Sequence, residues 1–319
     1  MKAVRIHEFG GPSVLRYEEA PTPEPASDQI LVRVHAAGIN PVDGKIRSGT
    51  YRFRPELPAI LGRDISGVVE KSEVNDFRVR DEVFGILDYH RGSYAEYAVA
   101  APNEIVRKPA ALDHLHAGSI GVAALTAWQA LFDNGELRSG QRVLIHGGGG
   151  GVGHYAVQFA AAAGADVVAT ANVKDLEFVR SLGAKQVIDY KAQRFEEEVS
   201  EIDLVIDLVA GETRKRSWKV LKPGGLMVST LGEPEIPSDA PKGARSRGMV
   251  VETKADQLSE IGNRAATGKL RIEIAKVFQL SDAVNAHEFL ENEHFRGKIV
   301  FAVRDDWRPT TEIASSWQR

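Results

Sequence analysis

The chain has 319 residues, of which 43% are hydrophobic and 26% charged, and its formal net charge at pH 7 is −4. This composition is typical of a globular protein with room for two domains, and it argues against nucleic acid or an anionic membrane as a partner. Because the chain contains no cysteine, disulfides, thiolate nucleophiles and cysteine-bound zinc are excluded. With no signal-like apolar segment at the N-terminus and no run of 18 apolar residues, we expect a cytoplasmic protein.

The first third of the chain is predicted to be rich in β-strands. Short strands are expected at 2–7, 29–36, 65–71 and 82–86, and segments rich in glycine and proline separate them. His114 and His116 follow in a segment that we interpret as a loop bounded by proline. A surface pair of histidines is favoured there over a metal site.

From residue 123 to residue 265 predicted strands and helices alternate. Strands near 142–146, 166–170, 186–190, 202–209 and 225–230, with helices between them, indicate a parallel sheet covered on both faces. Gly164 and Gly183 stand where helices should end. We expect a polar loop at 232–247 and an apolar edge strand at 248–252. Strand, helix and strand then return at 275–280, 281–292 and 298–303.

The most specific motif is the glycine-rich turn after the strand at 142–146. Six of the seven residues from Gly147 to Gly153 are glycine, and an alanine-rich helical segment follows. Strand, glycine turn and helix are the context in which G-x-G-x-x-G binds a dinucleotide pyrophosphate, and a flexible linker is the weaker interpretation. The predicted cofactor-binding residues of the turn are Gly148, Gly150, Gly151, Val152 and Gly153.

The end of the next strand, 166–170, bears on the choice of dinucleotide. An acidic residue usually stands there in NAD sites, where it binds the ribose 2′-hydroxyl. Here the strand continues into Ala171, Asn172 and Lys174, and the first carboxylate is Asp175. Asn172 can donate a hydrogen bond and Lys174 supplies a cation, so we predict NADPH rather than NADH. The alternative for Lys174 is a solvated lysine in a first helical turn.

A series of motifs in a fixed order resembles a known family. These are AGINPVD at 37–43, SGTY at 48–51, LGRD at 61–64, GVVE at 67–70, GSYAEY at 92–97, LTAW at 125–128 and RGKIV at 296–300. With the glycine turn they resemble the zinc-independent quinone oxidoreductase and zeta-crystallin branch of the medium-chain dehydrogenase/reductase superfamily, over nearly the whole chain. The resemblance implies an α/β fold with a GroES-like β-barrel catalytic domain (1–122 and 266–319). An inserted Rossmann domain (123–265) with a doubly wound parallel sheet is implied as well. Since relatives pair through a sheet edge, a homodimer is expected.

The departures from the zinc enzymes of the superfamily are as informative. In zinc alcohol dehydrogenases a cysteine occupies the place of Asn40, and a His-Glu pair occupies the place of Arg63 and Asp64. This chain lacks those ligands, so we expect no tetrahedral zinc. Without a Lewis acid to polarise an alcohol, reduction of an already electrophilic acceptor is favoured.

The resemblance also implies roles for single residues. Asn40 is expected at the nicotinamide end of the cleft, where its amide would donate to a substrate oxygen, although an Asn-Pro turn explains it equally well. Tyr51 resembles a cleft tyrosine able to donate a proton, and a loop tyrosine is the alternative. Thr126, expected at the start of a helix that joins the domains, resembles a residue near the nicotinamide ribose; a capping or buried threonine is the alternative. Tyr190 resembles a tyrosine near the adenosine phosphate, and Lys298 belongs to a segment that closes over the cofactor.

Three further residues are interpreted structurally. Salt bridges, for example with Arg63 or Arg47, are expected for Asp43 and Asp64. His146, at the end of its strand, is expected to be packed rather than to act as a base.

The sequence therefore predicts an NADPH-dependent, zinc-free reductase of a quinone or of an α,β-unsaturated ketone or aldehyde. Two alternatives stay open. An enoyl-thioester reductase would need basic residues for a phosphopantetheine arm, and Arg52 and Arg54 stand beside Tyr51. A non-catalytic NADPH-binding structural or sensor protein is the other.

Overall fold

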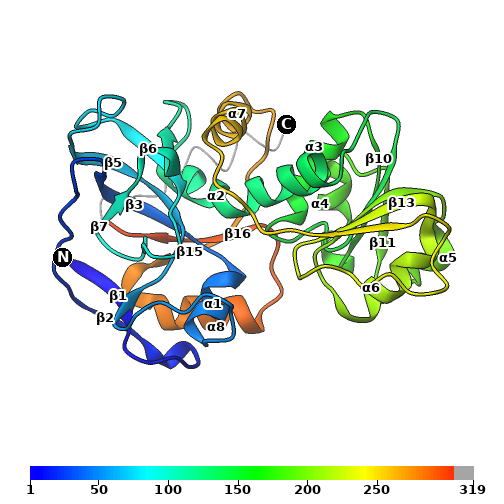
Figure 1. Cartoon of the computed structure of the whole chain (residues 1–319), viewed down its shortest axis with the longest axis horizontal. Coiled ribbons are helices and arrows are strands. Elements are labelled where there is room, and N and C mark those ends of the chain that lie inside the picture. Colours follow the sequence, from blue (N-terminus) through cyan, green and yellow to red (C-terminus); the bar gives the residue numbers. More distant parts are fainter. Residues whose placement is uncertain (305–319) are drawn as a thin grey trace.

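The computed structural model describes residues 1–304, which form three sheets and eight α-helices (Figure 1). The first sheet has the strand order β15-β16-β3-β5-β6-β8, with β7 paired to β3. A small sheet of order β2-β1-β4 lies beside it. The strands of these two sheets are β1 (Lys2–Ile6), β2 (Leu15–Glu19), β3 (Ile30–Ile39), β4 (Ala59–Ile60), β5 (Asp64–Ser72), β6 (Glu82–Ile86), β7 (Tyr97–Ala100), β8 (Ile105–Arg107), β15 (Ile274–Gln279) and β16 (Lys298–Ala302).

The second sheet has the order β11-β10-β9-β12-β13-β14, and all its strand pairs are parallel. This is the strand order of a doubly wound dinucleotide-binding fold. The predicted fold class is confirmed. The strands are β9 (Arg142–Ile145), β10 (Asp166–Ala171), β11 (Gln186–Asp189), β12 (Ile202–Asp207), β13 (Leu221–Ser229) and β14 (Arg245–Gly248).

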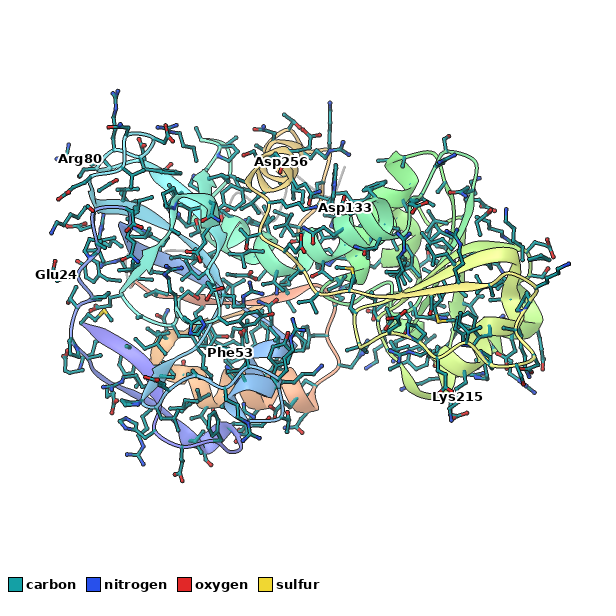
Figure 2. The ribbon with its side chains drawn as sticks, viewed as in Figure 1. Glu24, Phe53, Arg80, Asp133, Lys215 and Asp256 are labelled. Atoms are coloured by element: carbon teal, nitrogen blue, oxygen red, sulfur yellow. The ribbon has the colours of Figure 1, made fainter. Side chains whose placement is uncertain are left out.

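The helices of the described residues are α1 (Pro41–Arg47), α2 (His114–Trp128), α3 (Gly153–Ala162), α4 (Leu176–Ser181), α5 (Phe195–Glu198), α6 (Gly211–Ser217), α7 (Ala255–Ala266) and α8 (Ala283–Asn292). Helices α3 and α4 pack on the second sheet, whereas α8 packs against α1, β2 and β15 beside the other two sheets. Gly164 and Gly183 follow α3 and α4 with φ of 79° and 107°, the left-handed region that only glycine adopts without strain. Their predicted role in ending helices is confirmed. Charged side chains such as Glu24, Arg80 and Lys215 lie at the periphery of the molecule (Figure 2).

Helix α2 crosses the middle of the molecule and packs against β3, β5 and β6 on one side and α3 and α7 on the other (Figure 1). With the π-helical turn that follows it, His114–Asn134 is the helix among the described residues that is long and apolar enough to span a membrane. Most of it is buried inside the protein, as in the core helix of a globular domain.

Two predictions about this segment were wrong. His114 and His116 lie in the first turn of α2, not in a loop, and the Asp113 side chain caps that turn by accepting from the His116 N–H (2.9 Å). Thr126 lies in the last turn of α2 rather than at a helix start. Because the helix is buried almost all round, its apolar residues form a continuous run without the 3.6-residue period that would have revealed its bounds.

The edge strand of the second sheet was also predicted at the wrong place. The strand is β14, and it pairs with β13 from Leu226↔Arg245 to Ser229↔Gly248. The predicted loop at 232–247 therefore ends at 244, and 248–252 is not a strand except for its first residue. The sequence of β14 is Arg-Ser-Arg-Gly, and such a polar edge strand has no apolar pattern to detect.

Candidate active site

A cleft of about 390 Å³ lies between the two large sheets. The residues that line it come from six segments. They are Ile39, Asn40, Pro41, Val42 and Lys45 around the start of α1; Val122, Ala123 and Thr126 of α2; Gly147, Gly150, Gly151, Val152 and Gly153 of the glycine turn; Leu208, Val209, Thr230 and Leu231 after β12 and β13; and Leu290, Phe295, Gly297, Lys298 and Ile299 of the C-terminal segment.

The cleft lies at the carboxyl ends of β9 and β12, where the strand order of the parallel sheet reverses. Ligands of doubly wound folds bind at this switch point. Of the residues predicted from the sequence, the cleft brings together Asn40, Thr126, Lys298 and four members of the glycine turn.

The glycine turn fits a dinucleotide pyrophosphate. A Cβ on Gly153 would lie 2.0 Å from the Gly147 carbonyl oxygen, so no side chain fits there. A Cβ on Gly148 would lie 2.9 Å from Ala169 Cβ, which shows how closely the turn packs on β10. Among residues 1–304, no hydrogen-bond acceptor faces the N–H groups of Gly151 and Val152 at the start of α3. Free N–H groups at a helix N-terminus are the donors that bind phosphate.

The floor of the cleft is a buried polar cluster around Asn40. Its Nδ2 donates to Asp64 Oδ2 (2.9 Å), and its Oδ1 accepts a hydrogen bond from Lys298 Nζ. Lys298 Nζ also donates to the Ile39 carbonyl (3.0 Å) and lies 3.6 Å from Asp64 Oδ2. The other oxygen of Asp64 accepts from the Val122 N–H of α2 (2.6 Å). The orientation of the amide is thus determined by an acceptor on one side and a cation on the other.

Strand register brings these distant residues together. Ile299 of β16 pairs with Ile39 of β3, so Lys298 lies beside Asn40, the residue between the end of β3 and the start of α1. Asn40 precedes Pro41, the first residue of α1, and its N–H donates to Asp43 Oδ2 (2.8 Å), a capping interaction. Tyr94 Oη donates to the same oxygen (2.8 Å).

Burial dominates the electrostatics of the cluster. It lowers the pKa of Lys298, and the nearby Asp64 and Asp43 carboxylates oppose that effect. Burial raises the pKa of Asp43 to about 6, although the hydrogen bonds from Tyr94 and Asn40 oppose it. The pKa of Tyr94 is raised well above its usual range by burial and by the Asp43 carboxylate.

The expected salt bridges of Asp43 and Asp64 were assigned to the wrong partners. Asp64 pairs with Lys298, and Asp43 accepts hydrogen bonds from Asn40 and Tyr94 and forms no salt bridge within residues 1–304. Arg47 instead pairs with Glu291 of α8 (2.6 Å). Arg63 donates to the Leu87 carbonyl (2.9 Å) and lies 3.9 Å from the centre of the Tyr89 ring.

The remaining candidate residues lie away from the lining of the cleft. The Tyr51 hydroxyl pairs with that of Tyr89 (3.0 Å). Asn172 Oδ1 accepts the Lys174 N–H (3.1 Å) at the end of β10, and the Lys174 side chain is exposed. Tyr190, after β11, is 49% exposed. His146 is fully buried, and its predicted packed position at the strand end is confirmed.

The C-terminal segment contacts the glycine turn. The Gly297 N–H donates to the Gly149 carbonyl (2.9 Å), and His294 Nε2 lies 2.7 Å from Asp175 Oδ2 at the start of α4. The Asp64–Lys298 pair and the Asp43–Tyr94 bond, by contrast, escaped the sequence analysis. Their only local signal was the position of both acids within family-like motifs.

Comparisons with known proteins agree with this site. Residues 26–110 match the family model of the alcohol dehydrogenase GroES-like domain, 135–216 that of the alanine dehydrogenase/PNT C-terminal domain, and 182–301 that of the zinc-binding dehydrogenases. The quinone oxidoreductase of Sus scrofa is 34% identical over 322 residues, which cover 94% of this chain and 97% of the relative. The chain belongs to the quinone oxidoreductase family.

Solved structures of the quinone oxidoreductase family support the same conclusion. The quinone oxidoreductase of Coxiella burnetii is 39% identical with a TM-score of 0.87, over 95% of this chain and 99% of that one. The Escherichia coli quinone oxidoreductase, in complex with NADPH, is 27% identical with a TM-score of 0.86, over 95% and 100%. This family member is therefore an oxidoreductase that uses NAD(P)H.

Proposed function

We propose that this quinone oxidoreductase relative reduces a quinone or an α,β-unsaturated ketone or aldehyde with NADPH and without zinc. The observation that carries the proposal is the Lys298–Asn40–Asp64 cluster on the floor of the cleft. The cluster and the glycine turn line one cleft, so a dinucleotide on the turn and an acceptor on the floor would meet there.

The bound dinucleotide supplies the hydride, and the chain supplies position and electrostatics. Addition of hydride to a quinone or enone places negative charge on the acceptor oxygen. The Asn40 amide nitrogen has two N–H groups, and only one of them is used by Asp64. The second N–H and the adjacent Lys298 cation are held in place before reaction, which is the arrangement that stabilises a developing oxyanion.

The walls of the cleft suit a planar apolar acceptor. Val42, Val122, Leu231, Leu290 and Phe295 line it beside the polar floor. Apolar walls with a few convergent polar groups are typical of small-molecule sites, and exclusion of water strengthens the interactions with Asn40 and Lys298. Tyr51 lies outside this lining, where its hydroxyl pairs with that of Tyr89 (3.0 Å), and its proposed role is to donate a proton to the product of enone reduction.

Two observations support NADPH. No carboxylate stands at the end of β10, and Asp175, the first one after it, is turned to His294 (2.7 Å). The similar Escherichia coli enzyme was crystallised with NADPH. The zinc-free assignment is supported by the donor set: within residues 1–304, no three or more His, Cys, Asp or Glu side chains form a group that could hold a metal ion.

The test is NADPH oxidation, followed by absorbance, with a panel of quinones, enones and one enoyl thioester. Quinones or enones should be reduced with the higher kcat/KM. Asn40→Ala should lower turnover by about 10²–10³, the usual effect of losing one oxyanion donor. Asn292→Ala, which removes an exposed amide bonded to the Glu288 carbonyl at the end of α8, is the matched control and should leave turnover unchanged.

Three results would contradict the proposal. The first is no oxidation with any acceptor, which would favour a binding or sensor protein. The second is a higher kcat/KM with the thioester. The third is unchanged turnover in Asn40→Ala.

A further inference from the structure

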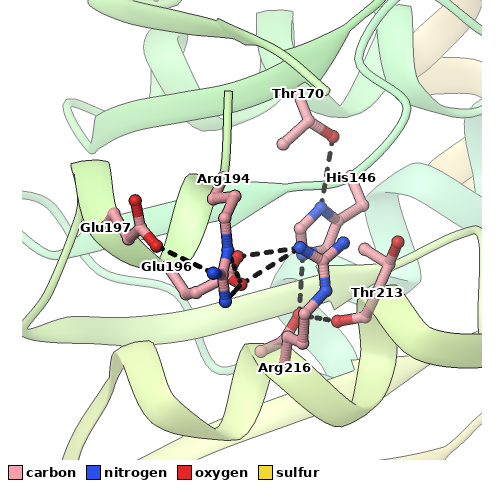
Figure 3. A network of polar contacts seen from close by, with 8 residues as sticks. His146, Thr170, Arg194, Glu196, Glu197, Thr213 and Arg216 are labelled. Carbon is pink, nitrogen blue, oxygen red and sulfur yellow. Dashed lines mark hydrogen bonds and ion pairs between the residues drawn. The ribbon is translucent and has the colours of Figure 1, made fainter. Parts of the chain in front are cut away.

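A chain of hydrogen bonds runs from the glycine turn to helix α6 through His146. His146 follows β9 directly and is fully buried. Its Nδ1 lies 3.2 Å from Thr170 Oγ1 of β10, and its Nε2 lies 2.8 Å from Ser217 Oγ, at the last residue of α6. Figure 3 shows the imidazole between Thr170 and the end of α6.

The donor and the acceptor of each hydrogen bond in this series follow from Ser217, its last residue. Ser217 Oγ donates its one proton to the Thr213 carbonyl (2.7 Å), so it accepts from His146, and Nε2 of the imidazole carries the proton. Burial lowers the pKa of His146 to about 4, so the ring is neutral at pH 7 and Nδ1 is an acceptor. Thr170 Oγ1 therefore donates to Nδ1, which leaves its lone pairs for the Gly147 N–H (3.2 Å).

Thr170 thus holds the first two residues of the turn. Its hydroxyl accepts from the Gly147 N–H, and its carbonyl accepts from the Gly148 N–H (2.9 Å). Gly147 has a φ of 72°, in the left-handed region that favours glycine. The two bonds to Thr170 hold the start of the turn in this conformation. The N–H groups of Gly151 and Val152, for which the described residues offer no acceptor, follow these anchored residues in the same turn.

Helix α6 connects this series of hydrogen bonds to the ends of β12 and β13. Arg214 of α6 donates to Asp207 Oδ2 at the end of β12 (2.6 Å) and to the Leu231 carbonyl after β13 (3.0 Å). Leu231 lines the cleft. One short helix is therefore connected both to the phosphate-binding turn, through His146, and to the loop after β13 that lines the cleft.

The His146 imidazole also contacts an aromatic ring. The Phe195 ring of α5 meets it edge-on at 4.8 Å between ring centres. Arg216 of α6 pairs with Glu196 (3.0 Å) and lies 5.0 Å from the centre of the same Phe195 ring, which ties α6 to α5 (Figure 3). The ring of His146 is thus held by two hydrogen bonds and an aromatic contact.

We propose that His146 is a positioning residue for the dinucleotide: as a neutral imidazole protonated on Nε2, it orients the phosphate-binding turn through Thr170 and anchors that turn to α6. The proposal depends on the dinucleotide site of the family and not on the identity of the acceptor. A residue that only fills space at this position would tolerate either tautomer and would not affect affinity for the cofactor.

The first experiment measures affinity for NADPH, and separately for NADH, by fluorescence titration. Thr170→Val keeps the shape of the side chain but removes the hydroxyl, and Ser217→Ala removes the acceptor of the Nε2 proton. Each should weaken binding about five- to tenfold, which is comparable with the net contribution of one hydrogen bond. Thr170→Ser retains the hydroxyl and should restore wild-type affinity.

Ser66→Ala is the matched control. Ser66 is also fully buried, donates to the Val83 carbonyl (3.1 Å) and contacts a histidine, His114 Nδ1 (2.8 Å), but it belongs to the first sheet. Its loss should lower stability to a similar degree without changing affinity for the cofactor. If Thr170→Val and Ser217→Ala weaken binding no more than Ser66→Ala does, the proposal is refuted.

The second experiment needs no cofactor, and it uses a variant only to assign the signals. Nitrogen NMR of the imidazoles at pH 7, with His146 assigned by its loss in a His146→Phe sample, distinguishes the two tautomers and the imidazolium. We expect a proton on Nε2 and none on Nδ1. A proton on Nδ1, alone or with Nε2, would overturn the directed chain. Neither experiment uses an acceptor, so failure of the proposed activity would leave this result standing.

Discussion

Replacement of Asp43 by asparagine should remove a pH dependence of stability that the wild-type protein carries. The side chain is fully buried, and its Oδ2 accepts two hydrogen bonds of 2.8 Å while Oδ1 has no partner among the described residues. Burial raises its pKa from 3.8 to about 6. A difference of about two in pKa between the unfolded and folded states corresponds to about 3 kcal/mol.

The sign follows from the raised pKa. At pH values below 3.8 the Asp43 side chain is protonated in both the folded and the unfolded state, so it does not lower the free energy of unfolding. As the pH rises toward about 6, the unfolded state releases its proton first, so the folded state loses stability; above about 6 the loss is complete and constant. The free energy of unfolding of the wild type, relative to Asp43→Asn, should therefore fall by about 3 kcal/mol between about pH 4 and pH 7.

Urea unfolding of the protein without cofactor, followed by tryptophan fluorescence at several pH values, measures this difference. Asp28→Asn is the control, because Asp28 is exposed on the surface and its replacement should leave the pH profile unchanged. The reasoning would be refuted by parallel profiles of wild type and Asp43→Asn over this range, or by a difference that grows in the opposite direction.

Four further predictions follow from the site and its surroundings. Lys174→Ala should weaken NADPH binding by roughly 1–3 kcal/mol, the value of a charge-assisted bond, and barely change NADH binding; equal losses in two parallel titrations would contradict it. Activity should survive dialysis against a chelator, and elemental analysis should find less than one zinc per chain; a stoichiometric zinc whose removal abolishes turnover would show the opposite. Tyr51→Phe should lower turnover with enones more than with quinones, whose reduced product takes its proton from water; equal effects in a steady-state comparison would exclude proton donation. Light scattering at micromolar concentration should give about twice the chain mass of 34.8 kDa, as the pairing of relatives through a sheet edge leads us to expect; a monomer mass would count against this.

The second sheet could be predicted because its signals are local. Each strand from β9 to β13 contains a buried apolar stretch, and Gly164 and Gly183 mark helix ends by a conformation that other residues avoid. The predictions for β14 and α2 were wrong for opposite reasons. The strand has too few apolar residues to show a period, and the helix has too many. Both are determined by their neighbours in space, which a sequence window does not contain.

The same distinction separates the two halves of the site. The glycine turn occupies seven consecutive residues, so its chemistry can be inferred from the sequence. The polar floor joins Asn40 to Asp64, 24 positions away, and to Lys298, 258 positions away. Only the pairing of β16 with β3 brings Lys298 to this place, and no local pattern predicts that register.

Because the floor of the cleft is assembled from distant elements, a substitution in it affects both the fold and the site. Asp64 bonds Asn40 on one side and the backbone of α2 at Val122 on the other, so the group that orients the amide also fastens the first sheet to the central helix. Sites built on such packed elements hold their geometry closely, but their parts are not independent. A change at Asp64 should therefore lower stability and turnover together, whereas a change at the exposed Lys174 should affect cofactor affinity alone. The floor of this cleft is in that sense part of the core of the protein, and its polar residues are held in position by the same contacts that hold the fold.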